Sequence, residues 1–167
     1  FAGGPDPAAL VGKSLVLTLT RAEGSQERKI AGYVVEAEVS TPRGDEEEIG
    51  PRVVARPRLF RLTQRADCRV LQDMTAPDIM KKVLDGAGVP ADAQSWKLEG
   101  SYPKRDYTTQ YRETDFAFIS RLMEQHGIFY YFQHTENDHT LTLQDNSQQL
   151  TTCSTQSSFR YAPEQGD

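Results

Sequence analysis

Carboxylates are the most plentiful groups in this sequence that could do chemistry. Aspartate and glutamate supply 24 of its 167 residues, among them Glu99, Asp106, Glu113 and Asp115. Two carboxyl groups that face each other across a sugar perform glycoside hydrolysis, so a cell-wall hydrolase with a carboxylate pair is one functional hypothesis. With so many acids, however, a suggestive pair is expected by chance. No spacing identifies a nucleophile beside a base.

Two short segments match catalytic or nucleotide-binding motifs by letter only. Residues 11–14 read VGKS, but a phosphate-binding loop needs a glycine five residues before Gly12, where Pro7 stands, and a helix afterwards, where we expect a strand. Residues 101–104 read SYPK, but Pro103 stands inside the helical turn that an S-x-x-K motif requires. Chance matches are favoured for both.

Histidine and cysteine are sparse. His126, His134 and His139 have no C-x-x-C pair or E-x-x-H pattern beside them, so surface histidines at strand ends are favoured over a zinc site. Cys68 and Cys153 lie 85 residues apart, and free thiols are favoured over one disulfide. We therefore expect neither a metal nor a cofactor.

Arginines are concentrated in one stretch in which Asp67 is the only acidic residue. The stretch contains Arg52, Arg56, Arg58, Arg61, Arg65 and Arg69. A nucleic-acid module would use such a stretch, but Phe60 is almost its only aromatic residue and the chain carries a net charge of −5. Arg56 and Arg58 are candidate interface residues. The alternatives are a solvated strand face whose positive charge is balanced by Asp45–Glu48, or contact with an acidic neighbouring subunit.

The first half of the chain reads as strands. Alternating apolar residues predict a half-buried strand over residues 13–20, a second over 30–40, a third over 52–62 and a short one over 68–72. Pro57 would make the third strand an edge or a bulge, because proline cannot donate to a ladder. Residues 1–12 and 146–158 read as loops.

The period then changes to that of helices. Thr75, with Asp78 three residues on, is typical of an N-cap, and Gly86 or Gly88 would end a helix near 76–86. Thr114 caps a second predicted helix, 115–126, that stops at Gly127. Their expected buried stripes are Ile79, Met80, Val83 and Leu84 in the first, and Phe116, Ile119, Leu122 and Met123 in the second.

A strand near 106–113 and a hairpin over 128–145 complete the pattern. The hairpin's first strand reads IFYYFQH, and alternation places Phe129 and Tyr131 opposite Tyr130 and Phe132. A strand apolar on both faces needs cover from two directions, which favours a component of an assembly. The fold class is α+β, with a β-rich part over residues 1–72 and an α+β part over 73–167. No apolar run is long enough to insert in a membrane, and no signal peptide is visible.

The segment GSYPKRDYTTQYRETDFAFISRLMEQHGIFYYFQH, residues 100–134, resembles the VgrG family of type VI secretion spike proteins, whose hub is gp27-like and related to phage late control D. Residues 56–84, 12–19 and 31–39 resemble the preceding strands and helix of that hub. The family often carries tryptophan where this chain has Leu59 or Phe60. The resemblance implies a barrel-like domain that is incomplete at its N-terminus, followed by a segment that is incomplete at its C-terminus.

What the family resemblance implies is mechanical and not enzymatic. Three full-length chains would form a homotrimeric, pseudo-sixfold ring on the hexameric Hcp tube, with a PAAR tip protein beyond and effectors as cargo. The protein would wait in the bacterial cytoplasm and then be secreted or injected into a target cell. Arg112, Glu113, Asp115 and Arg121 would make structural ion pairs and caps. The nearest alternative is the hub of a phage or phage-like contractile tail.

Overall fold

A computed structural model describes residues 6–20, 27–39 and 51–150 of the chain. The first part holds α1 (Pro7–Leu10), β1 (Ser14–Thr20), β2 (Glu27–Val39), β3 (Pro51–Arg56) and the 3-10 helix η1 (Arg58–Gln64). The second part holds β4 (Ala66–Met74), α2 (Ala76–Gly86), η2 (Ala91–Ala93), β5 (Gln94–Lys97), β6 (Arg105–Thr114), α3 (Asp115–His126), β7 (Phe129–His134), β8 (His139–Gln144) and η3 (Ser147–Gln149). Sheets and helices together give the β-rich α+β fold that the sequence predicts.

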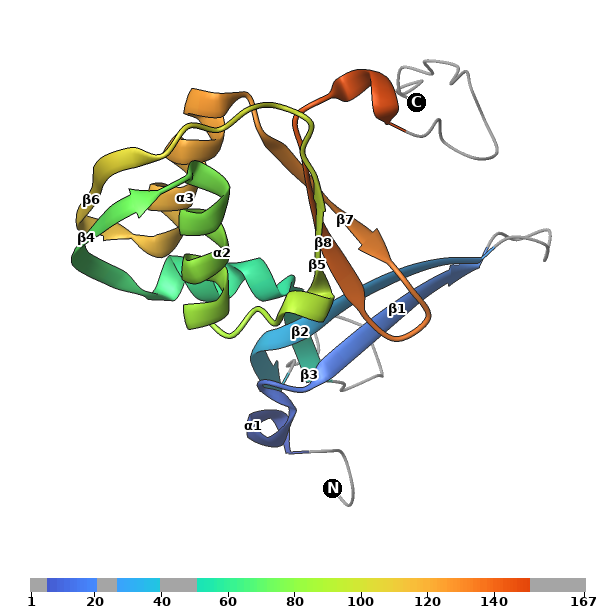
Figure 1. Ribbon diagram of the computed structural model, residues 1–167. Coiled ribbons are helices and arrows are strands. Elements are labelled where there is room, and N and C mark those ends of the chain that lie inside the picture. The colour runs from blue at the N-terminus through green and yellow to red at the C-terminus, as the bar shows by residue number, and fades with distance from the viewer. Residues whose placement is uncertain (1–5, 21–26, 40–50, 151–167) are drawn as a thin grey trace, which may run out of the picture.

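The first sheet is antiparallel in the order β1-β2-β3, and it projects away from the helices (Figure 1). Leu17 on β1 stands opposite Ile30 on β2. The predicted strand over 13–20 is confirmed, but its expected half-burial is wrong. Leu17 and Leu19 are 48% and 49% exposed, because β1 is an edge strand with little of the described chain packed on it.

The predicted strand over residues 52–62 is wrong in its second half. β3 ends at Arg56, Pro57 is extended, and η1 follows. Leu59 and Leu62 are both buried, three residues apart, and three residues is one turn of a 3-10 helix. Period-two alternation cannot bury both side chains on one face, so packing against the core selects the helix.

The second sheet pairs β4 with β6, and the third has the order β5-β8-β7 (Figure 1). β4 runs from residue 66 to 74, longer than the predicted 68–72, while β6 spans the predicted 106–113. The sequence pattern missed β5, a four-residue strand that carries Trp96 and pairs in parallel with β8.

The two predicted helices lie between the second and third sheets (Figure 1). Thr75 accepts a hydrogen bond from the Asp78 N–H, and Thr114 accepts one from the Ala117 N–H, so both predicted caps are confirmed. Gly127 ends α3 in the left-handed conformation, φ 66°. None of the helices within the described ranges is long and apolar enough to cross a membrane.

The core gathers side chains from both helices, η1, β4 and β8. The α2 stripe is buried as predicted, and its members are Ile79, Met80, Val83 and Leu84. The α3 stripe differs at one position. Phe118 is fully buried, and Phe116 is only partly buried at the core's edge. Phe118 lies one helical turn before Leu122 and therefore faces the core with it. Phe116 lies at the edge of this buried stripe.

Several sequence predictions fall on residues that the structure does not describe. They include the role of Asp45–Glu48, most of the loop over 146–158, and Cys153, so the state of the two thiols stays a prediction. The division of the chain at residue 72 also stays a prediction. β4 continues through that position to Met74.

Candidate functional site

A buried carboxylate organises the start of α3. Because β6 runs directly into the helix, Asp115 falls in its first turn, and only 1% of its side chain is exposed. Its Oδ1 accepts a hydrogen bond from Arg69 Nη2 on β4 at 2.8 Å. Its Oδ2 lies 3.5 Å from Arg65 Nε but accepts no hydrogen bond in the described part of the chain. Two arginines therefore compensate the buried charge, one by a direct hydrogen bond.

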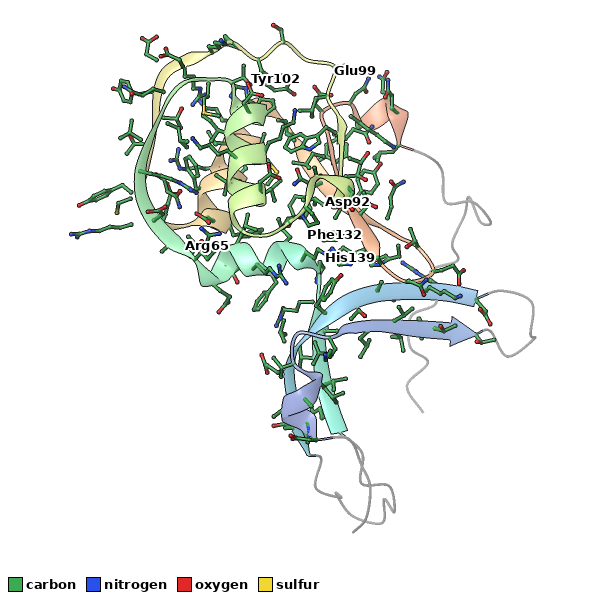
Figure 2. The ribbon with its side chains drawn as sticks, turned by 60° about the horizontal axis from the view of Figure 1, so that its bottom comes forward. Arg65, Asp92, Glu99, Tyr102, Phe132 and His139 are labelled. Atoms are coloured by element: carbon green, nitrogen blue, oxygen red, sulfur yellow. The ribbon has the colours of Figure 1, made fainter. Side chains whose placement is uncertain are left out.

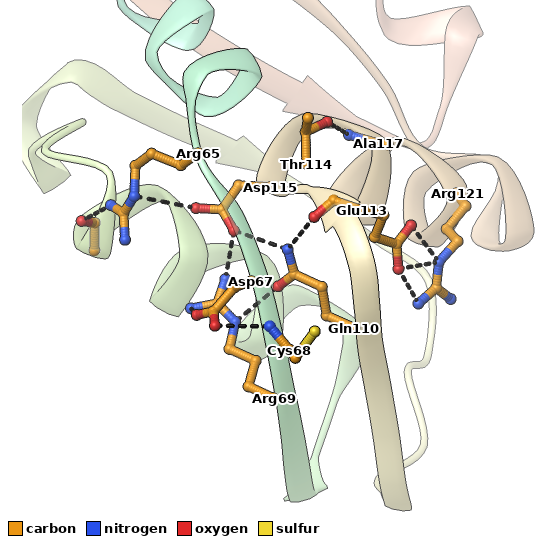
Figure 3. A network of polar contacts seen from close by, with 11 residues as sticks. Arg65, Asp67, Cys68, Arg69, Gln110, Glu113, Thr114, Asp115, Ala117 and Arg121 are labelled. Carbon is orange, nitrogen blue, oxygen red and sulfur yellow. Dashed lines mark hydrogen bonds and ion pairs between the residues drawn. The ribbon is translucent and has the colours of Figure 1, made fainter.

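Gln110 joins the two sides of this network (Figure 3). Its side chain is fully buried between Arg69 and Asp115. The Oε1 atom accepts from Arg69 Nε at 2.8 Å, and Nε2 donates to Asp115 Oδ1 at 2.9 Å and to the Glu113 carbonyl at 3.1 Å. Arg69 and Gln110 are directly opposed across β4 and β6, which explains why the three groups meet.

A second ion pair lies on the exposed side of the same helix. Arg121 donates from Nε to both oxygens of Glu113, at 3.1 and 3.2 Å, and from Nη2 to Oε1 at 2.8 Å. The same Nη2 reaches the Thr109 carbonyl at 2.5 Å, and the guanidinium lies over the Phe118 ring. The bidentate geometry clamps α3 onto the end of β6 (Figure 3).

Arg112 does not join these pairs. The β4–β6 register passes from Asp67↔Glu113 to Cys68↔Tyr111, so Arg112 is the extra residue of a β-bulge, with φ 47°. Its guanidinium lies over the Tyr111 ring, and within the described residues it contacts no carboxylate. Its expected part in a structural ion pair therefore stays a prediction.

The aromatic strand β7 is half-buried at all four aromatic positions. Tyr130 and Phe132 pack against the core, as the alternation predicts. On the other face, the Tyr131 hydroxyl donates to Gln144 Oε1 at 3.2 Å. Phe129 and Tyr131 are thus only partly covered by the described residues, and cover of this face by a neighbouring chain stays a prediction.

The far end of the hairpin meets η1 and β2. Arg58 donates to Asp138 Oδ2 at 2.5 Å and also to the Tyr33 hydroxyl. His139, buried at 3% exposure, accepts the Arg58 backbone N–H on Nε2 at 3.1 Å. Its proton must then sit on Nδ1, which has no hydrogen-bond partner in the described chain. The expectation of surface histidines is wrong for His139.

Histidine titration follows from this packing. Burial lowers the pKa of His139, and the positive charge of Arg58 lowers it further against the opposing effect of Asp138. Burial and the neighbouring Arg105 lower the pKa of His126 in the same way. Both imidazoles are therefore held neutral at neutral pH.

A third polar cluster fixes the chain after β5. Asp145 accepts hydrogen bonds from the Tyr102 hydroxyl and the Gly100 N–H, each at 2.7 Å, and from the Glu99 N–H. Burial would raise the pKa of Asp145, but these hydrogen bonds outweigh it and lower the pKa. The Asp145 carboxylate thus holds the loop that follows β5 by accepting its hydrogen bonds.

Two of the four candidate carboxylates, Glu113 and Asp115, are held by arginines of the same chain, and these ion pairs fasten α3 to the second sheet. The described residues hold no group of three or more histidine, cysteine or acidic side chains that could bind a metal ion. Sequence reasoning named Arg69 and His139 without these roles and did not single out Gln110. Only the register of β4 with β6 brings Arg69 and Gln110 together.

Comparison with known families decides the class. The family model described as phage tail baseplate hub (GPD) matches residues 2–167.

The chain belongs to this hub family.

Its similar proteins include type VI secretion system spike proteins of Pseudomonas aeruginosa. VgrG1b is 41% identical over 136 residues, which cover 81% of this chain and 18% of that protein. VgrG1c is 42% identical over 137 residues, which cover 82% of this chain and 18% of that protein. The actin cross-linking toxin VgrG1 of Vibrio cholerae is 36% identical over 94 residues, 56% of this chain and 8% of the toxin. The resemblance to VgrG spikes is confirmed, and the chain spans 18% of the length of the first two relatives.

A solved structure shares the hub fold. The E. coli c3393 protein, a component of the type VI secretion system with structural similarity to the T4 bacteriophage tail proteins gp27 and gp5, aligns with TM-score 0.74 at 24% identity. The alignment covers 86% of this chain and 39% of that one. The gp27-like fold expected from residues 100–134 is therefore confirmed.

Proposed function

We propose that this hub-family chain is a structural part of a type VI secretion spike and catalyses no reaction. The identity of 41% to a spike protein over 136 residues carries the proposal. The use of Glu113 and Asp115 in ion pairs that fasten α3 to the second sheet supports it.

In the proposed mechanism the hub acts by shape. Three full-length chains form a trimeric ring that caps the hexameric Hcp tube, with a PAAR tip beyond and effectors as cargo. The protein stays in the bacterial cytoplasm until the system fires and then leaves with the spike. The rigid unit of α3, β7 and β8, fixed by the Asp115 network and by Arg58 at the hairpin end, would hold the ring's form under load.

Binding of the full-length protein to purified Hcp rings tests this function. We expect co-elution of the two proteins, with no turnover of peptidoglycan by either the wild type or the Glu113→Gln variant. Peptidoglycan cleavage that Glu113→Gln abolishes would favour the hydrolase.

A phage-like contractile tail is the second candidate, favoured by the family's description as a phage tail baseplate hub. The domain composition of the full-length protein separates the two. A fused β-helical needle indicates a type VI spike, and its absence indicates a tail hub.

A further inference from the structure

A positively charged groove runs beside η1 in this acidic protein. It has a volume of about 490 Å³ and is lined by Arg56, Arg58, Arg61 and Arg65, with no aspartate or glutamate among its described lining residues. The chain as a whole carries a net charge of −5. η1 extends from the neighbourhood of Phe132 and His139 to Arg65 (Figure 2). Arg58, Arg61 and Arg65 follow this helix, and Arg56 precedes it at the end of β3.

Contacts within the chain hold the arginines in place. Arg61 donates to the Gly88 carbonyl at 3.0 Å and Arg65 donates to the Gly86 carbonyl, so both cap the C-terminal end of α2. Arg58 is paired with Asp138, and Arg65 lies near Asp115. A guanidinium has five N–H donors, so these contacts leave donors free.

Two of the four arginines have no acidic partner in the described residues. Arg56 lies over the Phe60 ring, 4.9 Å from its centroid, and is exposed. Arg61 makes only its carbonyl contact and is also exposed. Among the described residues no acid faces this arginine pair, so its charge is available to an anion.

An apolar pocket adjoins the groove. It holds about 160 Å³ and shares Arg56, Pro57 and Phe60 with the groove. Its remaining wall includes Phe116, Tyr130 and Phe132. An occupant of both hollows would place carboxylates against Arg56 and Arg61 and an apolar side chain among the aromatic rings.

We propose that the groove binds an acidic segment of a partner polypeptide, in which carboxylates are followed by an apolar residue. Guanidinium groups match carboxylates in geometry, and the adjoining pocket gives the apolar residue a place to bury. A nucleic acid fits less well, because an overall negative charge repels its backbone outside the groove. The groove does not require the ring of the proposed function.

Fluorescence anisotropy with a labelled peptide of sequence GSGEDDEFGSG tests the proposal. This peptide carries four acids before a phenylalanine, and its acidic segment occurs nowhere in this chain. We expect saturable binding that weakens with salt and falls about tenfold or more in Arg56→Glu and in Arg56→Glu/Arg61→Gln. Because Arg56 caps no helix, Arg56→Glu should reduce binding without disturbing the end of α2. A peptide with glutamine and asparagine in place of its acids should not bind.

The matched control is Lys104→Glu/Arg112→Gln, which changes the same charge at exposed positions outside the groove. We expect it to bind the peptide like the wild type. Absent binding, or equal loss in the control and the groove variants, would overturn the proposal. Tighter binding of a 20-nucleotide DNA that depends on Arg56 would overturn it in favour of nucleic acid. Neither outcome bears on Hcp binding, which tests the proposed function separately.

Discussion

Arg69 and Asp115 form a 2.8 Å ion pair between β4 and the first turn of α3, and Asp115 is 1% exposed. The pair joins the second sheet to the helix that carries the core residue Phe118. Gln110 bridges the same two side chains, because it accepts from Arg69 Nε and donates to Asp115 Oδ1. The junction therefore depends on a buried polar network of three side chains.

Asp115→Asn should destabilise the protein by about 3 kcal/mol, because it leaves the partly buried Arg69 without its carboxylate. Urea unfolding followed by circular dichroism measures the loss. Asp106→Asn, an exposed acid on the same β6, is the matched control and should change the free energy of unfolding by less than about 0.5 kcal/mol. Equal effects of the two substitutions would contradict the structural role of the network.

The position of the α3 stripe gives a second prediction. Phe118→Ala should cost about 3–5 kcal/mol, since the side chain is fully buried in the core. Phe116→Ala removes the same atoms from a partly buried site and should cost clearly less. Thermal unfolding of the two variants measures the difference. A larger loss of stability in Phe116→Ala than in Phe118→Ala would contradict the burial of Phe118 in the core.

The aromatic strand gives a third prediction. Phe129→Ala and Tyr131→Ala should each cost less than Phe118→Ala in the isolated chain, because both side chains are only half-buried there. If a neighbouring chain covers this face in the full-length assembly, the same substitutions should weaken assembly, as gel filtration would show. Unchanged thermal stability and unchanged assembly in both variants would contradict a role for this face.

Two glycines give a prediction about the backbone. Gly127 ends α3 at φ 66° and has open space around its Cα, so Gly127→Ala meets no clash and should cost about 1 kcal/mol through the backbone alone. Gly86 also faces open space but is the last residue of α2 and has no positive φ, so Gly86→Ala should be neutral or slightly stabilising. Chemical unfolding that shows the same sign for both would refute this account of the helix end.

The histidines predict how stability depends on pH. Their pKa values are lowered from 6.5 in the folded state, so the unfolded chain binds more protons just below that value. Stability is therefore fully present above about pH 6.5 and decreases as the pH falls below it. Urea midpoints at pH 7.5 and 5.5 should show the fall, and His139→Gln should reduce it. A midpoint that rises on acidification would contradict the buried, neutral His139.

The sequence could predict what is locally encoded. Thr75 and Thr114 mark helix starts, and Gly127 marks an end, because capping depends on a few neighbouring residues. Period-two alternation predicted β6 and the hairpin.

Tertiary packing decided what the sequence could not predict. Leu59 and Leu62 form a 3-10 helix because both fill the core, and β5 exists because Trp96 lies beside β8. Glu113 and Arg121 were expected to form ion pairs, and the structure brings these two together. Arg69 and Gln110, however, join Asp115 only through the register of β4 with β6.

The mass of the full-length protein in solution, from size-exclusion chromatography with light scattering, tests the hub account most directly. The account predicts a trimer, because the hub is proposed to work as one ring on a hexameric tube. A monomer at micromolar concentration would contradict it and would return the hydrolase and binding-module hypotheses to consideration.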